Sequence, residues 1–162
     1  MRQATTTAYL SMLSMLSMTT GLAPVQALHS PLPSANQLRV MEMGLSQFMH
    51  FSVDPFSPGV QHNCVGGNPD CIPAAMFNPT NLSTDQWVEA AAAFGAEEIC
   101  LTAHHEGGFC LWDTKYSNYS VMHSPYGKDV VKQFVDSCKK YGIKPCYYMG
   151  PNANGYLAYN QR

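Results

Sequence analysis

The chain has few charged residues. Of its 162 residues only 12% are Asp, Glu, Lys or Arg, and 9 basic residues stand against 11 acidic ones, giving a formal net charge of -2. Nucleic-acid-binding domains usually gather an excess of Lys and Arg on one face, so this balance argues against a nucleic-acid partner. Hydrophobic residues make up 46%, which is typical of a folded domain and not of a disordered chain.

Long apolar runs are missing after the first 30 residues, so no later segment is expected to span a bilayer. At the N-terminus, Arg2 precedes an uncharged stretch rich in Leu, Met, Ser and Thr over residues 8–22. This pattern predicts a secretory signal peptide over residues 1–27, cleaved after Ala27. A membrane anchor is disfavoured because the stretch is short, diluted by Ser and Thr, and lacks a basic flank. We therefore expect a secreted, extracellular protein, with the lysosome or another secretory compartment as the alternative.

Six cysteines in an exported chain permit disulfides. Cys64 and Cys71 bracket a loop of Gly, Pro and Asn, and we predict that they pair. The other four could be thiols or bridges, and the sequence leaves both open: Cys100, Cys110, Cys138 and Cys146. The sequons at Asn81 and Asn118 predict N-glycosylation in a host that glycosylates.

Strands and helices are expected to alternate after a short lead helix. The predicted order is helix 34–43, strand 45–52, a long loop, helix 84–94, strand 98–103, helix 129–141 and strand 143–149. Each of the two later helices is followed by a glycine, Gly95 or Gly142, and then by a strand. Such alternation predicts parallel strands joined by right-handed crossovers, and therefore an α/β fold.

Two α/β architectures fit this alternation. A doubly wound nucleotide site needs a Gly-rich turn directly after the first strand, and the chain has neither that turn nor a phosphate loop. A (β/α)8 TIM-like barrel is therefore favoured, but a full barrel needs about 250 residues. With about three predicted strands, the chain is expected to be an incomplete N-terminal portion of such a barrel, and a piece of a longer protein.

The candidate site lies in residues 99–112, ICLTAHHEGGFCLW. An apolar strand leads there into three titratable side chains, a glycine pair and an aromatic cluster. Parallel α/β folds place their sites at the carboxyl ends of strands, so this loop is the first candidate. A metal centre built from His50, His104, His105 and Glu106 is the main chemical alternative. It is disfavoured because the second His of an HExxH motif is missing.

Four segments, in this order and at this spacing, carry a family resemblance. They are PLPSANQL with FMHF, FNPTNLSTDQWVEAAAAFGAEEICLTA, HEGGFCLWDTKYSNYSV, and GKDVVKQFVDSCKKYGIKPCYY. Over residues 32–151 the sequence resembles the α-L-fucosidases of glycoside hydrolase family 29. The resemblance implies a retaining exo-glycosidase that releases terminal α-L-fucose from glycans and uses no cofactor. It also implies that residues 28–162 are the truncated first part of a catalytic barrel.

Two carboxylates perform the double displacement in such enzymes, one as nucleophile and one as acid and then base. The resemblance places both beyond Arg162, so no catalytic residue is expected in this chain. An inactive carbohydrate-binding remnant or truncated product is therefore the alternative function. The resemblance assigns substrate binding to His50, His105, Glu106 and Tyr148, and Trp112 is added because its ring could pack against the less polar face of a sugar.

The role in substrate binding has an alternative at two of these five residues, Glu106 and Trp112. Glu106 stands where the family has a second His, while His104 stands where it usually has Lys. Trp112 could equally be a packed aromatic under the loop.

Overall fold

The structure is a computed structural model that describes residues 32–57, 72–151 and 154–160. The predictions for residues 1–27 and for the pair Cys64 and Cys71 lie outside the described residues. The chain divides into two compact units, Met1–Ser34 and Ala35–Arg162, and the sheet and the candidate site belong to the second. Within the described ranges, no helix has the length and apolar character needed to cross a membrane.

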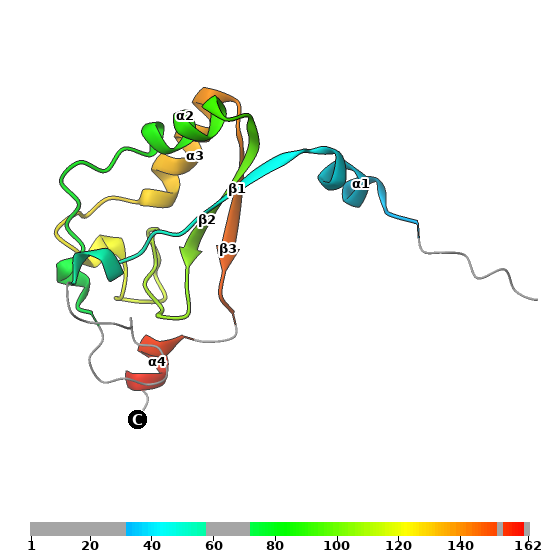
Figure 1. Ribbon diagram of the computed structural model, residues 1–162. Helices are drawn as coiled ribbons and strands as arrows, with labels where there is room; N and C mark the ends of the chain where they lie inside the picture. The colour runs from blue at the N-terminus through cyan, green and yellow to red at the C-terminus, as the bar shows by residue number, and fades with distance from the viewer. Residues whose placement is uncertain (1–31, 58–71, 152–153, 161–162) are drawn as a thin grey trace, which may run out of the picture. The chain divides into compact units, whose positions relative to one another are not determined.

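Three parallel strands form one sheet in the order β1-β2-β3 (Figure 1). Their bounds are Leu45–Met49 for β1, Ala96–His104 for β2 and Lys144–Met149 for β3. Helix α2, Thr84–Ala93, connects β1 to β2, and α3, Val130–Tyr141, connects β2 to β3. The predicted order of strands and helices and their parallel pairing are confirmed.

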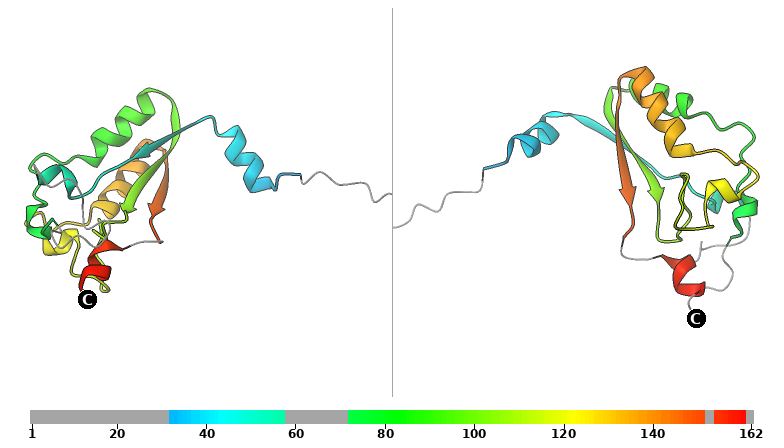
Figure 2. Two further views of the ribbon diagram at one scale, coloured as in Figure 1. Left: turned by 60° about the horizontal axis from the view of Figure 1, so that its bottom comes forward. Right: turned by 180° about the vertical axis from the view of Figure 1, so that it is seen from behind.

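Helices α2 and α3 lie side by side against one face of the sheet (Figure 2). Successive strand residues point to opposite faces, so alternate residues of β2 reach this interface. Ile99 and Leu101 are fully buried there, as are Val88 of α2 and Phe134 of α3. Each such side chain contributes about 1.5–3 kcal/mol relative to full exposure. This interface is the core that holds the sheet in shape.

The opposite face of the sheet, here called the inner face, carries the alternate residues. At the amino ends of the strands Glu98 accepts hydrogen bonds from Ser46 at 3.3 Å and from Lys144 at 3.0 Å. Farther along the strands Phe48, Cys100 and Cys146 lie opposite one another in register, and Phe48 is 50% exposed. All four cysteines that the sequence left open, Cys100 and Cys146 among them, are free thiols.

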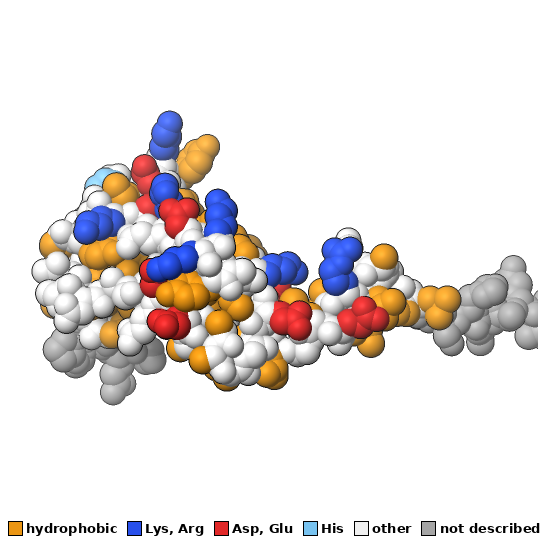
Figure 3. Space-filling model, turned by 90° about the horizontal axis from the view of Figure 1, so that it is seen from above, with side chains coloured by type: hydrophobic (Ala, Val, Ile, Leu, Met, Phe, Trp, Pro, Cys, Tyr) orange, Lys and Arg blue, Asp and Glu red, His pale blue; other side chains and the backbone are white. Residues whose placement is uncertain are grey.

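Local signals explain where α3 begins and ends. The Asp129 carboxylate accepts the backbone N–H of Lys132 at 2.7 Å, which caps the first turn. At the other end Gly142 adopts φ +70°, a left-handed conformation that glycine takes at little cost. Two ion pairs lie on the outer surface of the helices, Lys140 with Asp85 at 2.6 Å and Lys132 with Asp136 at 2.8 Å. Acidic and basic side chains are interspersed on the face seen in Figure 3.

The remaining described elements are short. They are α1, Ala35–Glu42, the 3-10 turns η1, Asp54–Phe56, η3, Ala74–Met76, and η4, Val121–His123, and the helix α4, Gly155–Asn160. The expected strand 45–52 is too long, because β1 ends at Met49. From there the backbone pairs with a side chain of β2 instead of its backbone, since the N–H of Phe51 donates to the Thr102 hydroxyl at 3.0 Å.

Candidate functional site

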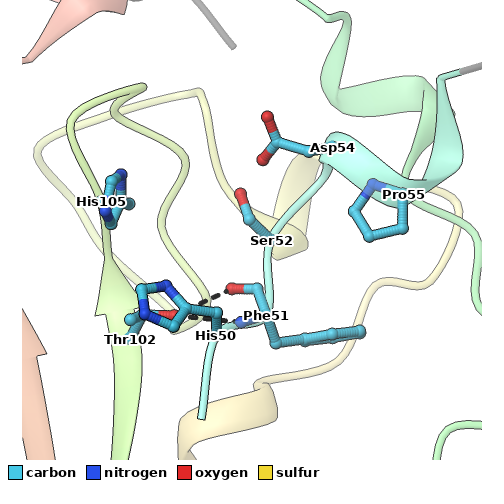
Figure 4. A pocket seen from close by; sticks show the side chains of 7 residues that line it. All are labelled: His50, Phe51, Ser52, Asp54, Pro55, Thr102 and His105. Atoms are coloured by element: carbon cyan, nitrogen blue, oxygen red, sulfur yellow. Dashed lines mark hydrogen bonds between the residues drawn. The ribbon is translucent and has the colours of Figure 1, made fainter. Parts of the chain in front are cut away.

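A cavity of about 310 Å³ opens at the carboxyl ends of β1 and β2 (Figure 4). The described residues that line it are His50, Phe51, Ser52, Asp54, Pro55, Thr102 and His105. The volume lies at the lower end of the range for small-molecule sites. The lining combines two imidazoles, a carboxylate and two hydroxyl groups with apolar ring surface, which suits a small polyhydroxylated ligand.

Thr102 fixes the floor of this cavity. Its side chain is only 2% exposed, and its hydroxyl accepts the N–H of Phe51 at 3.0 Å. The same hydroxyl lies 3.3 Å from the carbonyl oxygens of Met49 and Phe51, to either of which it can donate. His50 is the residue between these two, so Thr102 holds the backbone of His50 from both sides.

Three of the five predicted substrate-binding residues come together above this floor. The ring centroids of His50 and His105 lie 5.8 Å apart, and those of His105 and Tyr148 lie 5.7 Å apart. Phe48 packs its ring edge-on against His50 at 4.7 Å and against Tyr148 at 5.7 Å. The three strands thus each contribute a ring to one cluster at their carboxyl ends, with polar tips available to a ligand.

Glu106 and Trp112 lie apart from this cluster. The described residues that line the cavity include neither of them, nor Tyr148. Glu106 is half-buried, and its backbone carbonyl accepts the N–H of Gly155 at 2.8 Å. Trp112 is also half-buried, and its ring contacts His104 with centroids 6.3 Å apart. Both residues belong to the wall beside the cavity.

His104 is the most buried ionisable side chain of this wall. Desolvation lowers its pKa, and the neighbouring charge of His105 lowers it further, while a hydrogen bond from the ring to the backbone of Gly150 acts in the opposite direction. Its Nε2 atom lies 3.3 Å from Nδ2 of Asn154, in the segment that leads to α4. An imidazole with a lowered pKa therefore stands directly beside His105.

The sequence did not point to several residues of the site. Thr102 reads as an ordinary strand residue, and Phe48 as one more aromatic of a strand. Ser52 and Asp54 fall in the long loop, where a hydroxyl and a carboxylate after a strand were the only signal. Asn154 could not be found at all, because its contact with His104 spans 50 residues.

The predicted modification sites lie on the surface, since both Asn81 and Asn118 are exposed. In the described ranges no group of three or more His, Cys, Asp or Glu side chains is arranged to hold a metal ion.

Comparison with known proteins identifies the family. The family model described as alpha-L-fucosidase matches residues 39–159. The chain belongs to the α-L-fucosidase family. It is 36% identical over 124 residues to alpha-L-fucosidase 1 of Arabidopsis thaliana, covering 75% of the chain and 23% of that protein. Human plasma alpha-L-fucosidase is 27% identical over 90 residues, covering 55% of the chain and 18% of that protein.

Solved structures of this family have the same fold. A putative alpha-L-fucosidase from Bacteroides thetaiotaomicron superimposes with a TM-score of 0.70 at 34% identity, covering 82% of the chain and 28% of that structure. A glycoside hydrolase 29 family member from an unknown rumen bacterium gives a TM-score of 0.65 at 36% identity, covering 74% and 21%. The chain thus spans about a quarter of the length of the relatives that it matches.

Proposed function

We propose that the chain forms the N-terminal part of the catalytic (β/α)8 barrel of a retaining α-L-fucosidase, which releases terminal α-L-fucose from glycans. The observation that carries the proposal is the convergence of His50 and His105, with ring centroids 5.8 Å apart, at the carboxyl ends of β1 and β2. Active sites of such barrels lie at this end. The similarity to solved fucosidases, which extends over most of the chain, supports the same reading.

In this proposal the chain supplies part of the fucose-binding pocket. Imidazole and phenol groups can both donate to and accept from sugar hydroxyls, so His50, His105 and Tyr148 hold the ring. Glu106 accepts from a further hydroxyl and Trp112 packs against a less polar sugar face. The two carboxylates of the double displacement come from the protein beyond Arg162.

The inner face supports the proposal of a larger barrel. Phe48 on this face is 50% exposed, and β1 and β3 form the two edges of the described sheet. Unpaired strand edges and exposed apolar residues are unfavourable in isolation. Further strands of a longer gene product would pair with these edges and cover the inner face.

We also propose that the protein is exported and carries the modifications of an exported protein. The protein is secreted or enters another secretory compartment after cleavage at Ala27, and Cys64 pairs with Cys71. The exposure of Asn81 and Asn118 makes both sequons accessible to a glycan.

Hydrolysis of an aryl α-L-fucoside tests the function. We expect no turnover by these 162 residues alone and turnover by the full-length gene product. Replacing His50 or His105 with Ala in the full-length protein should raise KM about three- to tenfold for each neutral hydrogen bond lost. His123 of η4 does not line the cavity and provides the matched control, His123→Ala.

Two outcomes would contradict the proposal. Turnover by the 162 residues alone would place catalytic groups within this chain. Fucose binding without turnover by the full-length protein would favour the carbohydrate-binding remnant.

A further inference from the structure

The chain that leaves β3 is tied to the turn that carries His105. This turn, residues 104–108, is here called the His105 turn. Three backbone hydrogen bonds join the two segments: Gly150 N–H to the His104 carbonyl at 3.0 Å, Gly155 N–H to the Glu106 carbonyl at 2.8 Å, and Tyr156 N–H to the Gly107 carbonyl at 3.3 Å. The position of the His105 turn therefore depends on the segment after β3.

One side-chain contact joins the same two segments, and its chemistry is determined by the neighbouring atoms. The Asn154 side-chain oxygen accepts the N–H of Leu157 at 2.9 Å, which fixes the orientation of the amide. The amide nitrogen then faces His104 Nε2 at 3.3 Å. An amide nitrogen only donates, so Nε2 must accept, and His104 must be neutral with its proton on Nδ1.

The tight approach of Asn154 also explains a glycine in the turn. Gly108 has φ +94°, and a Cβ atom there would lie 3.0 Å from Cγ of Asn154 and even closer to its side-chain oxygen. Only glycine avoids both the strained backbone and this collision. The turn is thus built around the Asn154 side chain.

Burial and the neighbouring His105 favour the neutral form of His104, whereas the hydrogen bond to the backbone of Gly150 opposes them. The His104 side chain is 9% exposed. Trp112, Asn154 and the backbone of Gly150 contribute no charge, and the adjacent titratable group, His105, lowers the pKa of His104 when protonated. The net result is a pKa of His104 below its ordinary value.

We propose that His104 is a positioning residue: its neutral imidazole accepts a hydrogen bond from Asn154 and so holds the His105 turn in the geometry that binds the sugar. The role in sugar binding rests on the proposed fucosidase function, whereas the contact itself does not. Protonation of Nε2 would set two donors against each other, remove this side-chain contact and leave the turn held by the three backbone hydrogen bonds alone.

The substitution Asn154→Asp tests the contact in the full-length protein. A carboxylate keeps the acceptor for the N–H of Leu157 but replaces the donor that faces His104 by an acceptor. We expect ¹⁵N NMR of labelled histidine to find wild-type His104 as the Nδ1–H tautomer, with a pKa below its ordinary 6.5. In Asn154→Asp that pKa should rise above 6.5, because the carboxylate favours the imidazolium. An Nε2–H tautomer, or an unchanged pKa in the variant, would overturn the proposal.

Kinetics with an aryl α-L-fucoside test the consequence for the site. Removing the acceptor with His104→Ala should raise KM about fivefold, the equivalent of one neutral hydrogen bond. His104→Gln offers another acceptor and should keep KM within about twofold of wild type. Asn154→Asp should bind substrate best in acid, the reverse of wild type. Equal KM values and parallel pH profiles for all variants would refute the positioning role. A wild-type protein that hydrolyses no fucoside would refute the proposed fucosidase function. It would not refute the hydrogen bond between His104 and Asn154, which the NMR measurement tests independently.

Discussion

Replacing Thr102 with Val tests how the end of β1 is held in place. Valine has the shape of threonine and an equal or better preference for strands, so the change leaves no cavity and no unfavourable backbone propensity. It removes only the hydroxyl. The N–H of Phe51, which donates to that hydroxyl at 3.0 Å, then loses its acceptor in a part-buried position.

The expected cost follows from this one orphaned donor. A buried donor left without a partner costs about 1–3 kcal/mol, whereas the contacts at 3.3 Å to Met49 and Phe51 are long and share a single hydrogen. We therefore expect Thr102→Val to lower the local opening free energy by about 1–3 kcal/mol. His50 lies between the two released carbonyls, so its ring should become mobile on the inner face.

Hydrogen exchange at the Phe51 amide measures this effect directly. A loss of 1–3 kcal/mol corresponds to about 5- to 150-fold faster exchange at that amide. Thr102→Ser retains the hydroxyl and should keep most of the protection. The reasoning fails if Phe51 exchanges at the wild-type rate in Thr102→Val, or if the Ser and Val variants behave alike.

Three further outcomes are expected. Ser137→Ala should lower the free energy of unfolding by about 1–2 kcal/mol, because the buried Thr84 hydroxyl loses its 2.7 Å partner and the Asp85 carboxylate loses a 2.6 Å donor. Urea titration measures this free energy, and the double variant with Thr84→Val should recover the part that comes from Thr84. Gly108→Ala should destabilise by roughly 1–3 kcal/mol through its positive φ, and an unchanged urea midpoint would contradict this. Burial raises the pKa of Cys110 and of Cys138 to about 11, so both thiols should react with Ellman's reagent at pH 8 only after unfolding; labelling of the folded protein would disprove their burial.

The repeated βαβ pattern could be read from the sequence because its signals are local. Asp129 and Gly142 delimit α3 through contacts within a few residues, and alternation along β2 separates core residues from inner-face residues. These features are consequences of period and capping, which neighbours in sequence determine. The assignment of His50 and His105 to one site came instead from the family resemblance, and the structure brings their rings together.

The missed features depend on contacts between distant segments. Helix α4 has six residues, too few for an apolar period, and its first N–H groups donate to carbonyls of the His105 turn. The early end of β1 follows from one hydroxyl of β2, and the role of Asn154 follows from an imidazole 50 residues away. No local propensity encodes such partners, so only the assembled fold shows them.

The long sequence separation between β1 and β2 has a consequence for biosynthesis. The contact that closes the floor of the cavity joins residues 51 positions apart. At about 5–20 residues per second, a ribosome adds that length in about 3–10 s. Throughout this interval the nascent β1 has no strand to pair with. Phe48, which is 50% exposed even when β1 is paired with β2, is then exposed to solvent. A chaperone that binds extended apolar segments would find its target here, in the first strand of the sheet to be made.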